Sequence, residues 1–136
     1  MTHPFSGGCM CGAVRYESSA EPLAFVMCHC RDCQYASGGQ PAAVVVLPKG
    51  AVKLTKGKIK EFTKAGESGK KVTRQFCADC GTPMFSVPEE NPISIVKAGT
   101  LDDPSWLKPS ITIWTKSAQP WAHIDKGIPA FEKQPG

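Results

Sequence analysis

Seven cysteines, gathered in three short motifs, constrain the fold of this 136-residue chain more than any other feature of its sequence. They are Cys9 and Cys11, then Cys28, Cys30 and Cys33, then Cys77 and Cys80. An odd number of thiols does not form a fully paired disulfide framework. In a reducing compartment, thiols spaced by one or two residues are more typical of metal ligands than of disulfides. We therefore expect a fold built around metal sites.

The first and third motifs together supply four thiolates, which is the number that a closed tetrahedral zinc site needs. Gly81 follows Cys80 directly, permits a positive φ and leaves backbone N–H groups available to sulfur. The alternative is four buried cysteines without a metal, which the doubled short spacing disfavours. The pattern predicts a structural zinc held by Cys9, Cys11, Cys77 and Cys80. Its removal is expected to unfold the adjoining edge of the sheet.

The middle motif leaves three thiols for a second site, namely Cys28, Cys30 and Cys33. Three thiolates leave one coordination position of a zinc ion open, and an open position distinguishes a catalytic metal from a structural one. Two alternatives stay open at this stage. One is a redox dithiol of Cys30 and Cys33, and the other is a second structural site completed by a distant ligand.

The histidines are expected to lie outside the ligand sets. His29 stands between two of the middle thiols, but adjacent residues of an extended segment point in opposite directions. We therefore expect His29 to pack against the site or support it rather than bind the metal. His3 is expected to be terminal and mobile.

The composition is that of one ordinary globular domain over residues 1–136, with 41% hydrophobic and 21% charged residues. The formal charge of +4 falls to 4 − 7 + 4 = +1 when seven thiolates bind two Zn²⁺. The lysines between residues 49 and 71 are expected to be solvated charges that protect strand edges, so no nucleic-acid partner is predicted. A secretory signal and a membrane-length apolar stretch are both missing, which favours a cytoplasmic protein. The oligomeric state is not specified.

Short apolar and alternating segments predict an all-β fold with one or two short helical turns. Val14 and Tyr16 alternate with charged residues in a strand over residues 12–17, and an apolar run over 23–27 delivers Cys28 at the rim of a sheet. Helix formers from Cys30 to Ser37 predict the helical turns. Further strands are expected at residues 42–47, 72–76, 93–96 and 111–115.

Two more alternating segments, at residues 52–55 and 59–63, are separated by Lys56-Gly57-Lys58. A short linker with a central glycine is typical of a tight turn between antiparallel strands, so this segment predicts a hairpin. Trp114 lies in the last apolar strand, where we expect it to be part of the core.

Three segments carry a resemblance to a known family: GCMCGAVRY at residues 8–16, CHCRDC at 28–33 with Ser37-Gly38 after it, and FCADCGTP at 76–83. Together they resemble the glutathione-dependent formaldehyde-activating enzyme family, which also includes centromere protein V. Residues 121–131 are similar to the C-terminal segment of that family. The resemblance implies a small all-β, zinc-binding fold related to the Rab exchange-factor-like and methionine sulfoxide reductase B proteins. It also implies a structural zinc on the four outer cysteines and a second zinc on the middle three.

The activity implied by the resemblance is formation of S-hydroxymethylglutathione from glutathione and formaldehyde. The chain would then be a carbon–sulfur lyase-type enzyme that acts on a small thiol and a small aldehyde, with catalytic residues Cys28, Cys30 and Cys33. A guanidinium fork or backbone N–H groups would bind a substrate carboxylate. The expected contacts are Arg31, Ser37, Gly38 and Gly39. Two other classes stay open: a non-catalytic zinc-binding carrier of thiol ligands or interaction module, and a Cys30/Cys33 redox protein.

Overall fold

The structure is a computed structural model that describes residues 4–135, so His3 lies outside the described residues. The described chain is mostly β, as predicted, and its α-helix is short. Its strands are β1 (Phe5–Gly8), β2 (Arg15–Ser18), β3 (Ala24–Cys28), β4 (Ala42–Pro48), β5 (Val52–Lys56), β6 (Ile59–Ala65), β7 (Lys71–Cys77), β8 (Pro83–Pro88), β9 (Ile93–Lys97) and β10 (Ile111–Ile113). The helices are α1 (Arg31–Ser37) and the 3-10 turns η1 (Ala98–Thr100) and η2 (Thr115–Ser117).

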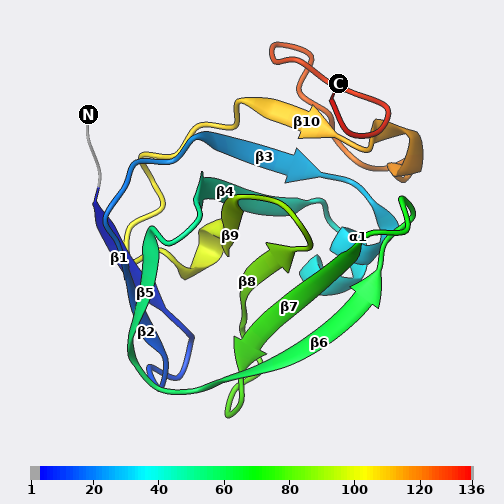
Figure 1. Cartoon of the computed structure of the whole chain (residues 1–136). Helices are drawn as coiled ribbons and strands as arrows, with labels where there is room; N and C mark the ends of the chain where they lie inside the picture. The colour runs from blue at the N-terminus through cyan, green and yellow to red at the C-terminus, as the bar shows by residue number, and fades with distance from the viewer. Residues whose placement is uncertain (1–3, 136) are drawn as a thin grey trace.

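The strands form two sheets (Figure 1). The larger has seven strands in the order β10-β3-β4-β9-β8-β7-β6, and the smaller has three in the order β1-β2-β5. All pairings are antiparallel except that of β10 with β3, which is parallel. Helix α1 lies at the side of the large sheet where β3 and β6 end, and the C-terminal segment runs beside β10. The order of the strands brings residues far apart in sequence to the region around α1.

The core lies between the two sheets. Val14 and Tyr16 are fully buried there with Leu47 and Met84, as the alternation predicts, although the strand predicted over residues 12–17 begins only at Arg15. The Tyr16 hydroxyl lies 2.8 Å from the Thr100 hydroxyl, so its polar end is hydrogen-bonded inside the core. Apolar packing therefore fixes the small sheet against the large one, and the hydrogen bond ties β2 to η1, which follows β9.

Helix α1 follows Cys30, which is its N-cap: the Cys30 sulfur accepts a hydrogen bond from the Cys33 N–H at 3.3 Å. Gly38 ends the helix in the left-handed conformation with φ 78°, and its N–H bonds the Gln34 carbonyl. The predicted helical turns and their glycine stop are confirmed. Cys28 ends β3 and Cys33 lies in the first turn of the helix, so a strand-to-helix junction brings the middle thiols together.

The predicted hairpin between residues 52–55 and 59–63 is wrong. β5 pairs with β2 in the small sheet, whereas β6 pairs with β7 in the large one. The chain changes sheets at Gly57, which has φ +86° and lies so close to Ala13 that a Cβ there would overlap the Ala13 carbonyl. A glycine in a short linker therefore marks a crossing between sheets here rather than a hairpin turn.

One further prediction needs correction, and two strands have no counterpart among the predictions. The strand expected at 111–115 ends at Ile113, and Trp114 adopts a left-handed conformation with φ 60° at the start of η2. Trp114 is nevertheless buried, as expected of a core residue. The sequence interpretation also missed β1, which contains Gly7-Gly8, and β8, which begins and ends at proline.

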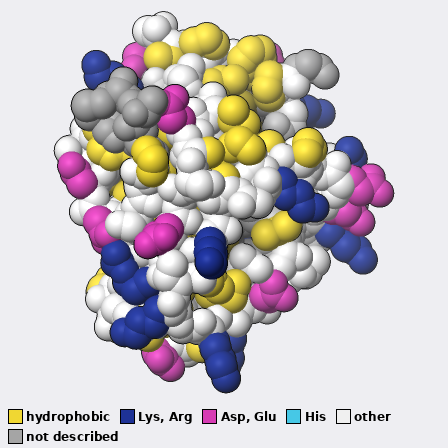
Figure 2. All heavy atoms as spheres, turned by 60° about the vertical axis from the view of Figure 1, so that its left-hand side comes forward, with side chains coloured by type: hydrophobic (Ala, Val, Ile, Leu, Met, Phe, Trp, Pro, Cys, Tyr) yellow, Lys and Arg dark blue, Asp and Glu magenta, His cyan; other side chains and the backbone are white. Residues whose placement is uncertain are grey.

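The surface seen in Figure 2 is the face around the small sheet, and it carries basic, acidic and hydrophobic side chains mixed together. Among the described residues, no helix is both long and apolar enough to cross a membrane.

Candidate metal centres and the adjoining pocket

The first and third motifs meet in space and form a four-cysteine cluster. The Sγ atoms of Cys9, Cys11, Cys77 and Cys80 all lie within 4.8 Å of one another. The sulfurs of Cys9 and Cys11 are 3.6 Å apart, and those of Cys11 and Cys77 are 3.8 Å apart. These separations are far longer than a disulfide bond of about 2.05 Å. They match the edge of about 3.8 Å that a tetrahedron with Zn–S bonds of about 2.3 Å has.

Backbone N–H groups are directed at the sulfurs of this cluster. The Val14 N–H lies 3.2 Å from the Cys9 sulfur, and the N–H groups of Asp79 and Cys80 lie 3.3 and 3.4 Å from the Cys77 sulfur. Gly81 has φ 77°, which closes the turn after Cys80. Such donors stabilise thiolates, the form of cysteine that binds metal. The donor set and its spacing therefore fit a metal ion with four sulfur ligands.

Hydrogen bonding also shifts the protonation of this cluster. The Thr82 hydroxyl lies 3.0 Å from the Cys80 sulfur and is the main reason that the pKa of Cys80 falls to about 6. The same hydroxyl accepts a hydrogen bond from the Met10 N–H at 3.1 Å, so it ties the first cysteine motif to the third. The cluster therefore contains a thiol that ionises below neutral pH.

The middle motif forms a separate three-cysteine cluster, in which the Sγ atoms of Cys28, Cys30 and Cys33 also lie within 4.8 Å of one another. Cys28 is buried at the end of β3, whereas Cys30 and Cys33 are partly exposed. His29 is buried, and its backbone N–H donates a hydrogen bond to the Ile113 carbonyl at 3.0 Å. Among the described residues, His29 does not join the group of potential ligands. Three sulfur donors fit a metal ion that keeps one position for another ligand.

The three thiols are electrostatically coupled. Hydrogen bonds with Cys28 and Cys33 are the largest causes of a strong lowering of the pKa of Cys30. Hydrogen bonds with Cys30 and Cys33, together with burial, raise the pKa of Cys28. These contacts therefore favour the thiolate form of Cys30 over that of Cys28.

Two cations from distant parts of the chain act on these thiols. The charge of Arg74, on β7, lowers the pKa of Cys30, and the charge of Lys97, at the end of β9, acts on Cys33. Burial lowers the pKa of Lys97, while the negative charge of Cys33 opposes this effect. Both cations line a pocket of about 390 Å³ between α1 and strands β6 to β9. Gly81, which follows Cys80, also lines it, whereas none of the seven cysteines does.

Sequence reasoning missed Arg74 and Lys97. Each is a single basic residue in a strand, without a motif around it. Nothing local distinguishes them from the other lysines and arginines, because their position near the thiols depends on how β7 and β9 are placed in the sheet.

The four residues predicted to bind a substrate carboxylate lie on α1 and in the turn after it. The Arg31 guanidinium lies 5.1 Å from the centre of the Tyr35 ring and donates a hydrogen bond to the Gln34 side chain at 2.5 Å. Ser37 donates to the Gln40 carbonyl, and the N–H groups of Gly38 and Gly39 both bond the Gln34 carbonyl. Their contact with substrate stays a prediction.

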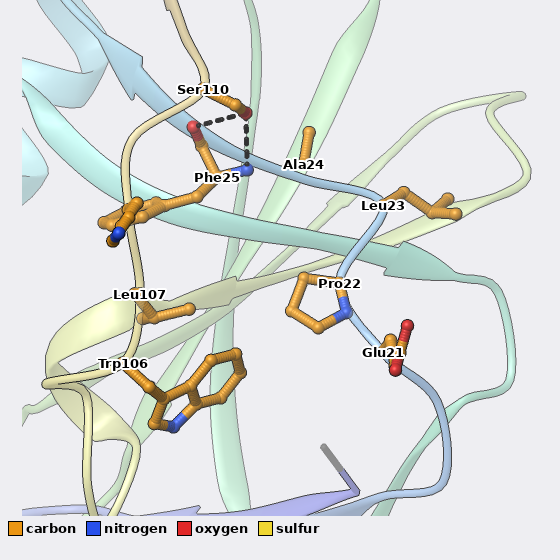
Figure 3. Close-up of a pocket in the computed structure, with 9 residues that line it drawn as sticks. Glu21, Pro22, Leu23, Ala24, Phe25, Trp106, Leu107 and Ser110 are labelled. Carbon is orange, nitrogen blue, oxygen red and sulfur yellow. Dashed lines mark hydrogen bonds between the residues drawn. The ribbon is translucent and has the colours of Figure 1, made fainter. Parts of the chain in front are cut away.

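A second hollow, of about 300 Å³, lies near the start of β3 (Figure 3). Trp106 and Leu107 lie on one side of it and Pro22 on the other, while Ser110 makes hydrogen bonds with the backbone of Phe25. None of the seven cysteines lines this hollow.

The fold and the two thiol clusters define a small all-β protein with two sites that could each hold a metal ion. A family model described as glutathione-dependent formaldehyde-activating enzyme matches residues 4–117, and the chain belongs to this family. This membership associates the chain with glutathione-dependent chemistry of formaldehyde. The likeness suggested for residues 121–131 lies beyond the matched segment and stays a prediction.

A crystal structure of a protein from Rhodobacter sphaeroides has a similar fold. The two share a TM-score of 0.55 and 22% sequence identity over 76% of this chain and 91% of that chain. At this level of identity the likeness concerns the fold alone.

Proposed function

We propose that the chain is a carbon–sulfur lyase-type enzyme that forms or cleaves the S-hydroxymethyl adduct of glutathione, or of another small thiol, with formaldehyde or a related small aldehyde. The observation that carries this proposal is the three-cysteine cluster beside a pocket. A purely structural site has no need of an incomplete ligand set next to a cavity. Family membership supports the same substrates.

We assign different roles to the two clusters. The four-cysteine cluster would hold a structural zinc, because its four sulfurs complete a tetrahedron and leave no position for substrate. The three-cysteine cluster would hold the reactive zinc through Cys28, Cys30 and Cys33. A zinc ion bound there supplies an open position that lowers the pKa of a substrate thiol.

The residues of the chain position the reactants. The pocket would hold the thiol substrate near the cluster, so that its sulfur is presented to the aldehyde carbon. The thiol sulfur attacks the carbonyl carbon and forms the C–S bond. The π electrons of the C=O bond move to oxygen, which takes up the proton that the thiol released. The reverse sequence cleaves the adduct.

Magnetisation-exchange NMR of glutathione, formaldehyde and their adduct at equilibrium tests this proposal. The adduct also forms without protein, so a sample without protein sets the baseline rate. Zinc-loaded wild type is expected to accelerate the exchange, whereas Cys30→Ser is expected to leave the baseline unchanged. Lys53→Met, a change at an exposed position of β5 in the small sheet, serves as the matched control and should accelerate exchange like wild type.

The exchange rate, together with the zinc content and the oxidation state of the thiols, separates the alternative functions. Wild type that carries two zinc ions per chain without accelerating exchange would refute this reaction and favour a carrier or interaction module. A Cys30–Cys33 disulfide that cycles with thioredoxin, with one zinc per chain, would instead indicate a redox protein.

A further inference from the structure

The pocket between α1 and the large sheet combines an aromatic lining with two positive charges. Its aromatic residues are Tyr35, Phe62, Phe76 and Phe85, and its cations are Arg74 and Lys97. Tyr35 and Phe62 are 79% and 60% exposed, so two large apolar side chains face solvent at this pocket. Exposed aromatic residues around a hollow with a few convergent polar groups are typical of a ligand site.

The two cations are not matched by acidic groups. The lining of the pocket contains no aspartate or glutamate, and the ion pairs among the described residues all involve other cations. The Arg74 Nε is buried and has no hydrogen-bond partner among the described residues. A buried donor without an acceptor is costly, so a ligand that supplies an acceptor to Arg74 would be stabilised here.

The thiolates of the three-cysteine cluster do not fully balance these cations. Three thiolates and one Zn²⁺ carry a formal charge of −1, and Arg74 and Lys97 contribute +2, which leaves +1 beside the pocket. An anionic ligand would neutralise this charge, and a planar carboxylate matches the fork of an arginine.

We propose that Arg74 and Lys97 bind a carboxylate of the thiol substrate, so that the enzyme selects thiols that carry a carboxylate within reach of their sulfur. This inference rests on the proposed function, because it places the sulfur of the same molecule at the three-cysteine cluster. The aromatic lining packs against the carbon chain between the two ends. Arg74 and Lys97 thus determine specificity through the end of the substrate that does not react.

Isothermal titration calorimetry of zinc-loaded protein with S-methylglutathione tests the carboxylate site alone, because the thioether has no thiol to ionise. Arg74→Met and Lys97→Met keep an apolar side chain in the pocket and remove the charge. Each is expected to weaken binding about tenfold or more, the usual effect of losing a hydrogen bond to a charged group. Lys53→Met, in the small sheet, is the matched control and should bind like wild type. Arg74→Lys is expected to recover part of the lost affinity.

A comparison of ligands gives the same test without any variant. The dimethyl ester of S-methylglutathione is expected to bind wild type at least tenfold more weakly than the free acid. Equal affinity of acid and ester, or unchanged affinity of both methionine variants, would overturn the inference and show that the cations act only on the cysteine thiolates.

The outcomes also separate this inference from the proposed reaction. Carboxylate-dependent binding of S-methylglutathione without acceleration of the formaldehyde exchange would uphold the binding site and refute the reaction. Accelerated exchange that is equal for 3-mercaptopropionate and for the cationic thiol cysteamine would uphold the reaction and refute the specificity.

Discussion

Gly57 is the residue at which the chain passes from the small sheet to the large one, and replacing it with alanine is a quantitative test of that crossing. Its φ of +86° is in the left-handed region, which costs an L-residue about 1–2 kcal/mol. A Cβ at this position would also overlap the Ala13 carbonyl and lie 2.9 Å from the Val14 Cα. Backbone atoms move less easily than the end of a side chain, so this overlap adds about 1–3 kcal/mol.

Gly50 provides the matched control. Its φ is +87°, but a Cβ there would have no neighbour within 4 Å, so Gly50→Ala bears the conformational cost without the overlap. We expect Gly50→Ala to lower the free energy of unfolding by about 1–2 kcal/mol. Gly57→Ala is expected to lower it by about 2–5 kcal/mol, the sum of the two effects. The difference between the variants isolates the contact with Ala13.

Urea denaturation of the zinc-loaded proteins, at equal free zinc, measures both values, and an unchanged m-value shows that the native state is still compact. Because Ala13 follows the Cys9–Cys11 motif closely, Gly57→Ala should also release zinc to a chelator faster than Gly50→Ala does. Equal losses of stability in the two variants would refute the close approach at Gly57 and the crossing of sheets that depends on it.

Two further predictions concern contacts away from the pocket. Arg15, with Ser6, lowers the pKa of Asp102 to about 2 from 3.8, so the carboxylate contributes stability above pH 3.8 that is lost as pH falls toward 2. The pair is 37% and 48% exposed, so solvent screening limits that contribution to about 1 kcal/mol. The stability gap between wild type and Asp102→Asn in urea denaturation should therefore close between pH 5 and 2, and a gap independent of pH would contradict this. Gln34 is buried and donates to the carbonyls of His29 and Ser117 at 2.7 and 3.0 Å. Gln34→Ala should lower the free energy of unfolding by about 2–4 kcal/mol and speed proteolysis after residue 114, and a loss below about 0.5 kcal/mol would show that these bonds are dispensable.

The sequence predicts the local parts of this structure well, because their causes are local. One- and two-residue cysteine spacings bring sulfurs together within a turn, and Gly38 ends α1 in the conformation that glycine favours. The alternation of apolar with charged residues predicts that Val14 and Tyr16 are buried. Tyr16 lies on the buried face of β2, and Val14 lies in the chain just before that strand. The division of the thiols into clusters of four and three follows from the four ligands that a closed tetrahedral site needs, not from a local spacing.

Features that depend on the pairing of distant strands were not predictable in the same way. β1 looked unlike a strand because of Gly7-Gly8, yet a Cβ on Gly7 would overlap Tyr16 and the Thr100 carbonyl, so the core requires glycine there. The residues that the sequence predicts to bind a carboxylate lie beside the cysteine motif, on Arg31 and in the turn after α1. Arg74 reaches the thiols only because β7 lies in the sheet near α1, which no local pattern indicates.

The central claim is that the seven cysteines form one closed and one open metal site. Cadmium-113 NMR of protein loaded with this metal in place of zinc tests it most directly, with glutathione added stepwise. We predict two resonances, one of which stays unchanged while the other shifts as glutathione binds at the three-cysteine cluster, and Cys33→Ser should alter only the second. A single resonance, or two resonances whose chemical shifts both stay unchanged when glutathione is added, would contradict the account.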